Sequence, residues 1–168
     1  MIEFIDTKRL QLRKMVKADA KSLLAIWSDP EVTKYMNITH FTQEEQALEM
    51  IELLGQLADQ QKAIRFSIFE KASNRIIGSC GFNVLDFDNA TTEIGYDLAK
   101  VHWGKGYAIE AITALINYAF TDLAMNTIVA KVEAANINSI KVLKKLKFIC
   151  QGYDHTDNTL QLYTLTKL

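Results

Sequence analysis

The sequence has few of the residues that cross-link a fold or bind metal ions: two cysteines and three histidines among 168 residues. Cys80 and Cys150 both lie in apolar, strand-like segments, which favours two buried thiols in a reducing compartment over a disulfide. The cysteines and histidines do not show the spacing of a metal-binding motif. We therefore expect neither a disulfide nor a metal centre.

Proline is nearly absent, and neither sign of charge is in excess. A single proline, no repeats and no low-complexity segment indicate one domain over residues 1–168. The hydrophobic fraction of 49% and the charged fraction of 23% are those of an ordinary globular protein. The net charge of −1 leaves no basic surplus to displace counterions, so we expect no nucleic-acid partner.

Long hydrophobic runs are also missing. No apolar segment approaches the length of a membrane span, which argues against a membrane partner. The first residues carry no basic region followed by an apolar stretch, so no signal peptide is expected. We accordingly predict a cytoplasmic protein.

The pattern of apolar residues predicts both helices and strands. Strands are expected at 9–13, 63–70, 75–84, 91–98 and 127–132, with two more within 149–167. Helices are expected to begin near Asp19, Thr42, Gly106 and Ser139. Asp29-Pro30 should end the first helix, and Thr42 and Glu45 have the spacing of a capping box. The order indicates an α+β chain with a mixed, largely antiparallel sheet.

A glycine-containing loop joins a predicted strand to a predicted helix. It reads Trp103-Gly104-Lys105-Gly106-Tyr107-Ala108 and follows the strand 91–98. The first N–H groups of a helix have no partner within the helix, and together with the helix dipole they attract anions. The loop lacks the third glycine of a dinucleotide fingerprint and the Gly-Lys-Ser/Thr of a nucleotide-binding P-loop. A plain tight turn and a phosphate or pyrophosphate site are the two interpretations.

The chain resembles the GNAT superfamily of acetyl-CoA-dependent N-acetyltransferases, and more narrowly the Rim-type branch that acetylates ribosomal-protein N-termini. The resemblance spans nearly the whole chain and rests on four segments: Arg9 to Arg13, Glu93-Ile94-Gly95-Tyr96, the loop 103–108 followed by Glu110-Ala111, and Asn136 to Phe148 with Gly152 beyond. It implies a seven-stranded sheet, splayed between strands 4 and 5, with about four helices packed on it. Homodimers are common in this superfamily.

The resemblance also implies where acetyl-CoA, the co-substrate, is held. Main-chain N–H groups of residues 103–108 would bind the pyrophosphate, and Tyr96 to Leu98 would pair with the pantetheine arm. The N–H near Leu98 would donate to the thioester oxygen, an interaction worth roughly 3–4 kcal/mol in the transition state. Asn136 and Ser139 match positions that face the coenzyme.

The reaction that the resemblance implies is direct attack of a primary amine on the acetyl group. An amino group is largely protonated at neutral pH, so a base must remove its proton. Glu93 is our first candidate for this base, with a structural or solvent-facing glutamate as the alternative; Glu133 is the weaker candidate. Ser139 is a candidate acid toward the thiolate, or a helix N-cap. Glu110 is expected to tie the helix start to nearby backbone.

Two positions depart from the superfamily pattern. Leu143 stands where many members carry a tyrosine that protonates the thiolate, which leaves this role to Ser139 or water. Lys147 replaces a glycine that normally ends the last helix in a left-handed conformation, so a different or strained ending is expected.

The acceptor is left open among a protein N-terminus, a polyamine or other small amine, and an antibiotic or toxic metabolite. Glu44, Glu45, Glu49 and Glu52 could line a polyamine site, but their helical spacing predicts an exposed face. An N-terminal or small-amine acceptor therefore ranks ahead of a polyamine. The aromatic residues Trp27, Tyr35, Phe41 and Phe82 are candidates for the acceptor wall or for the core. A second class is a non-catalytic module that senses acetyl-CoA.

Overall fold

The computed structural model describes residues 2–36, 38 and 40–168. The strands are β1 (Phe4–Asp6), β2 (Leu10–Lys14), β3 (Ile64–Glu70), β4 (Arg75–Asp86), β5 (Thr91–Leu98), β6 (Thr127–Glu133), β7 (Ile149–Tyr153) and β8 (Leu160–Thr166). The α-helices are α1 (Ala20–Trp27), α2 (Pro30–Thr33), α3 (Glu44–Asp59), α4 (Tyr107–Thr121) and α5 (Ile137–Lys145). Short 3₁₀ turns cover Lys17–Asp19 and Lys100–His102.

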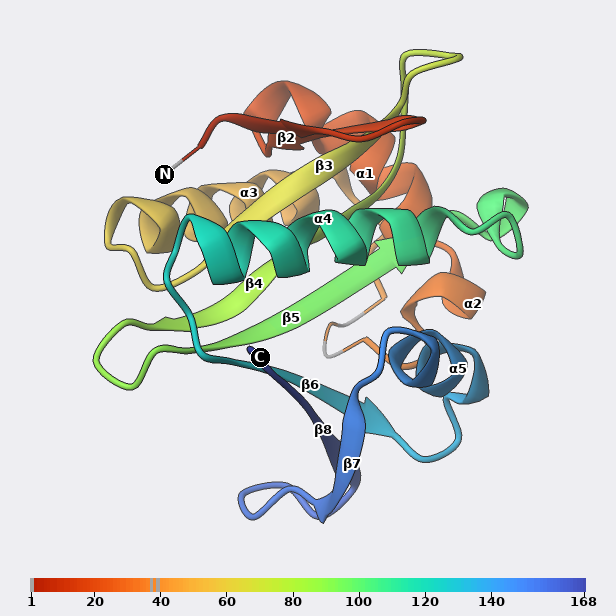
Figure 1. The fold of residues 1–168 in the computed structure, drawn as a ribbon. Helices are drawn as coiled ribbons and strands as arrows, with labels where there is room; N and C mark the ends of the chain where they lie inside the picture. The colour runs from red at the N-terminus through yellow and green to blue at the C-terminus, as the bar shows by residue number, and fades with distance from the viewer. Residues whose placement is uncertain (1, 37, 39) are drawn as a thin grey trace.

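The eight strands form one sheet in the order β1-β2-β3-β4-β5-β6-β8-β7. Helix α4 crosses one face of β2 to β5, while α1 and α3 lie behind the same strands (Figure 1). Alternation along β3 explains the layers, because Ile64, Phe66 and Ile68 point into the core beneath α4. The intervening Arg65 and Ser67 belong to the opposite face, where α1 and α3 pack.

The predicted splay is confirmed. Strands β5 and β6 are the one parallel pair among the described strands, and they pair only from Thr91↔Thr127 to Glu93↔Val129. Beyond Glu93 the two strands diverge, so their backbone groups face a gap rather than each other. The mixed, largely antiparallel sheet is confirmed as well.

The strand count of seven was wrong, because β1 adds an eighth strand in a hairpin with β2. Its three residues are exposed or half-buried, so the sequence shows no alternation of apolar and polar residues that would predict this strand. The estimate of four helices missed α2. Asp29-Pro30 does end α1, but the Asp29 side chain then caps α2 by accepting from the N–H of Glu31 at 3.0 Å, with proline at the first turn.

The predicted start of α3 is shifted by one residue. The cap is Gln43, not Thr42, and the residue that reaches back is Gln46, not Glu45. The Gln46 side-chain oxygen accepts from the N–H groups of Thr42 and Gln43, at 2.8 and 2.9 Å. An amide at the third helical position thus performs the role that we expected of a carboxylate. No helix in the described part of the chain has both the length and the apolar character needed to cross a membrane.

The two cysteines differ in exposure, which corrects the expectation that both are buried. Cys80 is buried in the core, whereas Cys150 on the edge strand β7 is exposed; both are free thiols. Burial raises the pKa of the Cys80 thiol to about 12.

We therefore expect iodoacetamide at pH 8 to alkylate the folded protein once, at Cys150, because Cys80 is buried and stays protonated. Peptide mass spectrometry measures the site and the stoichiometry. Denatured protein should take up two groups. Rapid modification of Cys80 in the folded state would contradict the structure.

Candidate active site

A cleft of about 660 Å³ occupies the gap between the diverging ends of β5 and β6. Its walls come mainly from β5, β6, α5, the α1–α2 region, α3 and the segment 154–160 that leads from β7 into β8, with Asn83 and Val84 contributed by β4. Four of the predicted site residues line it: Glu93, Tyr96, Asn136 and Ser139. Glu133 lines it too, whereas Leu98 and residues 103–108 lie outside the cleft lining, beyond the end of β5.

Glu93 lies where the β5–β6 pairing ends, with 20% of its side chain exposed. Asn83 donates to its Oε2 at 3.2 Å, and the Lys131 Nζ lies 3.5 Å from its Oε1. The same lysine lies 3.6 Å from Asp154, so one ammonium bridges two carboxylates of the cleft. A carboxylate held by two polar partners and open to a cleft is placed to accept a proton from a bound group.

A bulge in β4 brings Asn83 to Glu93. Phe82 pairs with Ile94 and Val84 with Glu93, so Asn83 has no partner in the ladder. Such an extra residue redirects its side chain. Gly95 makes room for it, because a β-carbon on Gly95 would lie 2.7 Å from the Asn83 amide nitrogen. From Asn83, polar contacts continue to buried side chains on the face of the sheet that α1 covers.

Arg65 is the centre of these contacts. It donates to the Asn83 oxygen at 3.1 Å and pairs with the Asp97 Oδ2 at 3.0 Å. Asp97, with 1% of its side chain exposed, also accepts from the Ser79 hydroxyl at 2.5 Å and from the Trp27 indole N–H at 3.3 Å. The buried charge is thereby paired and hydrogen-bonded, as its burial requires. Asp97 is thus buried between the sheet and α1, and Glu93 is the β5 carboxylate that opens to the cleft.

The sequence interpretation missed Arg65, Asn83 and Asp97. Arg65 stands among the apolar residues Ile64, Phe66 and Ile68. A charged residue within a buried strand usually has a partner, and this could have marked Arg65 as a functional candidate. Its partners come from other strands, so spacing along the chain does not reveal them.

A pair of hydroxyl groups bridges β5 and α5. The Tyr96 Oη lies 3.0 Å from the Ser139 Oγ. Burial raises the pKa of Tyr96, an effect that outweighs the lowering by the Ser139 hydrogen bond, so the phenol keeps its proton at neutral pH. The pair can therefore supply a proton within the cleft.

The N-cap of α5 is Asn136, not Ser139. The Asn136 side-chain oxygen accepts from the N–H of Ser139 at 3.3 Å, and the helix begins at Ile137 rather than Ser139. This cap leaves the Ser139 hydroxyl available to Tyr96. At the other end, Leu143 is buried in the core, and Lys147 adopts φ +72°. The expected strained ending is confirmed, because a lysine takes the left-handed conformation that usually needs glycine.

The loop 103–108 has the geometry of an anion site. Gly104 and Gly106 adopt φ +74° and +80°, and the first backbone hydrogen bond of α4 runs from Glu110 to Gly106. Among the described residues, the six N–H groups from 104 to 109 donate to no acceptor. Consecutive unpaired N–H groups at a helix N-terminus are suited to a phosphate.

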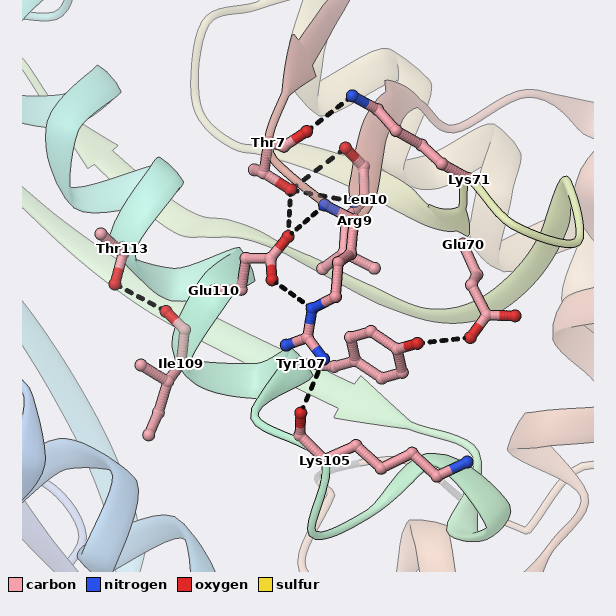
Figure 2. Close-up of polar contacts among 10 residues, drawn as sticks. All are labelled: Thr7, Arg9, Leu10, Glu70, Lys71, Lys105, Tyr107, Ile109, Glu110 and Thr113. Carbon is pink, nitrogen blue, oxygen red and sulfur yellow. Dashed lines mark hydrogen bonds and ion pairs between the residues drawn. The ribbon is translucent and has the colours of Figure 1, made fainter.

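Trp103 joins this loop to the strand. It is partly exposed, and its indole N–H donates to the Leu98 carbonyl at 2.8 Å. Glu110 ties the helix start to backbone, as predicted: it accepts from the N–H of Arg9 at 2.8 Å and from the Thr7 hydroxyl at 2.5 Å (Figure 2).

One wall of the cleft, contributed by the α1–α2 region and α3, is largely apolar. It contains Trp27 and Tyr35, as predicted, together with Met36, Met50 and Leu54. Phe41 and Phe82 are core residues instead. Glu44, Glu45, Glu49 and Glu52 are exposed on α3, as their spacing predicted, and do not line the cleft. The described residues contain no group of three or more histidine, cysteine, aspartate or glutamate side chains that could hold a metal ion.

A sheet opened between two parallel strands, with a glycine loop of unpaired N–H groups beyond the end of the first, is the architecture of an acetyltransferase. The family model of the acetyltransferase (GNAT) domain matches residues 9–149. The chain belongs to this family and is an acetyl-CoA-dependent N-acetyltransferase.

Three comparisons illustrate the relationship. The chain is 52% identical over 151 residues to the uncharacterised N-acetyltransferase p20 of Bacillus licheniformis, covering 90% of this chain and 85% of the relative. A GNAT-family acetyltransferase structure from Bacillus anthracis is 26% identical, with a TM-score of 0.84 and coverage of 97% and 98%. A ribosomal L7/L12 N-terminal protein acetyltransferase, solved with coenzyme A, has a TM-score of 0.88 at 20% identity, covering 98% of each chain, and shares the fold.

Proposed function

We propose that this chain transfers the acetyl group to the primary amine of a protein N-terminus or of a small molecule, by direct attack in the cleft. The observation that carries the proposal is the position of Glu93: a carboxylate at the point where β5 and β6 separate, open to the cleft. Acetyl-CoA supplies an activated thioester when bound. Glu93 accepts the proton of the amine, and the Tyr96–Ser139 hydroxyl pair provides one for the leaving thiolate.

The residues proposed to hold acetyl-CoA follow the same geometry. The free N–H groups of the loop, contributed by Gly104 to Ala108 behind Trp103, suit its pyrophosphate. Tyr96 and Leu98 at the end of β5, with the N–H of Leu98 toward the thioester oxygen, and Asn136 and Ser139 on α5 suit the pantetheine side. The loop fits an anion without any change of backbone, because its glycines already have the required conformation.

The lining of the cleft supports an acceptor with an apolar part next to its amine. Trp27, Met36, Met50 and Leu54 form one wall, and the carboxylates of Glu93 and Asp154 are bridged by Lys131. The four exposed glutamates of α3 lie elsewhere, which disfavours a polyamine held by that helix. A relative with the same fold is an N-terminal protein acetyltransferase, which agrees with this choice.

Calorimetry with acetyl-CoA, followed by a panel of amines with thiol release as the readout, tests the proposal. The panel should contain N-terminal peptides, spermidine and small apolar amines. Binding with thiol release for peptides or apolar amines is expected. Binding without release for any amine would favour the sensor module, and the absence of binding would contradict the proposed coenzyme site. A cytoplasmic location and a homodimer stay predictions.

A further inference from the structure

Arg9 contacts the glycine loop and the start of α4 from the outside of the cleft. It precedes β2, and its Nη1 donates to the Lys105 carbonyl at 2.9 Å. Its Nε donates to the Glu110 Oε1 at 2.7 Å, and its guanidinium carbon lies 4.3 Å from the centre of the Tyr107 ring (Figure 2). One side chain thus holds the loop, its junction with the helix and the first helical turn.

Arg9 is itself firmly held. Its backbone N–H donates to Glu110, and its carbonyl accepts from the N–H of Lys71 at 2.9 Å. Burial would raise the pKa of Glu110, but hydrogen bonds from Thr7 and Arg9 outweigh it and lower the pKa. Glu110 is therefore ionised at neutral pH, as an anchor for a guanidinium must be. On the far side, the Tyr107 hydroxyl donates to Glu70 at 2.6 Å.

The contact with Lys105 controls the direction of an N–H group. The C=O of Lys105 and the N–H of Gly106 belong to one planar trans peptide, so they point in opposite directions. Drawing the carbonyl toward Arg9 turns the Gly106 N–H away from Arg9 and leaves it, like the other unpaired N–H groups of the loop, available to a ligand. Gly106 on one side of this peptide would otherwise let it rotate more easily than a residue with a side chain would.

We propose that Arg9 is a positioning residue: it fixes the Lys105–Gly106 peptide and thereby sets the affinity of the loop for the pyrophosphate of the coenzyme. This inference rests on the coenzyme site proposed above. An arginine is needed, because its planar fork donates to Glu110 and to Lys105 while its face stacks on Tyr107. A lysine at this position would keep the charge but cannot make all three contacts.

Arg13, on β2 four residues after Arg9, provides a matched control. Its guanidinium carbon lies 3.9 Å from the centre of the Phe69 ring, and it donates to Gln11 and Asn74. Like Arg9, it stacks on an aromatic ring and donates two hydrogen bonds, but its acceptors are neutral amides outside the loop.

The test compares Arg9→Gln, Arg9→Lys and Arg13→Gln with the wild type. Calorimetry gives the Kd for coenzyme A, and an NMR titration gives the Kd for pantetheine, which lacks the pyrophosphate. Arg9→Gln and Arg9→Lys should both weaken coenzyme A binding about ten- to a hundredfold, the effect of a lost charge-assisted hydrogen bond. Pantetheine binding should not change, and Arg13→Gln should match the wild type for both ligands. In ¹H–¹⁵N spectra of the free protein, the Gly106 amide should shift only in the Arg9 variants.

The outcomes separate this inference from the proposed function. If the wild type binds coenzyme A no better than pantetheine, the loop is not a pyrophosphate site and the coenzyme site of the proposed function is wrong. If the wild type prefers coenzyme A and Arg9→Gln keeps the preference, the positioning role alone is wrong. If Arg9→Lys binds coenzyme A as the wild type does, Arg9 acts through its positive charge and not by positioning the peptide. If the Arg9 variants lose affinity for coenzyme A and pantetheine equally, Arg9 contributes only to the general stability of the fold.

Discussion

Glu93→Gln is expected to lower kcat for amine acetylation about a hundred- to ten-thousandfold, the usual contribution of a positioned general base. Glutamine has the same shape and can still accept from Asn83, so the cleft should keep its structure. The lost charge removes the proton acceptor and the ion pair with Lys131. The rate of thiol release across a range of pH, with the acceptor found in the amine panel, measures the effect.

Glu133→Gln is the matched control, since Glu133 is also a cleft carboxylate and was the weaker candidate for the base. It should retain most of the activity, and both variants should bind coenzyme A as the wild type does. An unchanged rate for Glu93→Gln at every pH would remove Glu93 from the mechanism. A large loss confined to Glu133→Gln would transfer the role to Glu133.

Gly106→Asp is expected to weaken coenzyme A binding by at least about a hundredfold, because like charges brought together at a binding site cost several kcal/mol. A β-carbon at this position would lie 3.4 Å from the Arg9 Nη2, an ordinary van der Waals contact, so the β-carbon itself does not clash. The new residue also must adopt φ near +80°, which costs about 1–2 kcal/mol for a residue other than glycine.

Gly152→Asp separates charge at the loop from backbone strain. Gly152 has φ +94° and open space around its α-carbon, and it lies on β7, which contributes nothing to the loop. Both variants should lose a similar amount of thermal stability, but Gly152→Asp should bind coenzyme A normally in calorimetry. Normal binding by a folded Gly106→Asp would show that the loop assignment is wrong.

The parts of the site that could be predicted from the sequence are those encoded locally. Two glycines between a strand pattern and a helix pattern identify the loop, because turn geometry and helix initiation depend on adjacent residues. The left-handed Lys147 is local in the same sense. The polar chain from Glu93 to Asp97 is different: Arg65 meets Asp97 across 32 residues, and only the register of β3, β4 and β5 brings them together.

The errors have the same origin. Strand β1 has no alternation of its own and is defined by its pairing with β2. The contact of Tyr96 with Ser139 was not predicted, because it depends on how α5 packs against the separated strand. Cys150 looks buried in the sequence because β7 is apolar, yet β7 lies at the edge of the sheet, where a strand can be exposed.

The two tryptophans of the chain both bond to the end of β5, Trp27 through Asp97 and Trp103 through the Leu98 carbonyl. One lies at the acceptor wall and the other at the loop, so the chain carries an intrinsic fluorophore on each side of its reaction site. The chain has no third tryptophan, so each single Trp→Phe variant keeps one tryptophan whose fluorescence reports on one side of the site. Stopped-flow fluorescence could then time the arrival of coenzyme and of acceptor independently, without any attached dye.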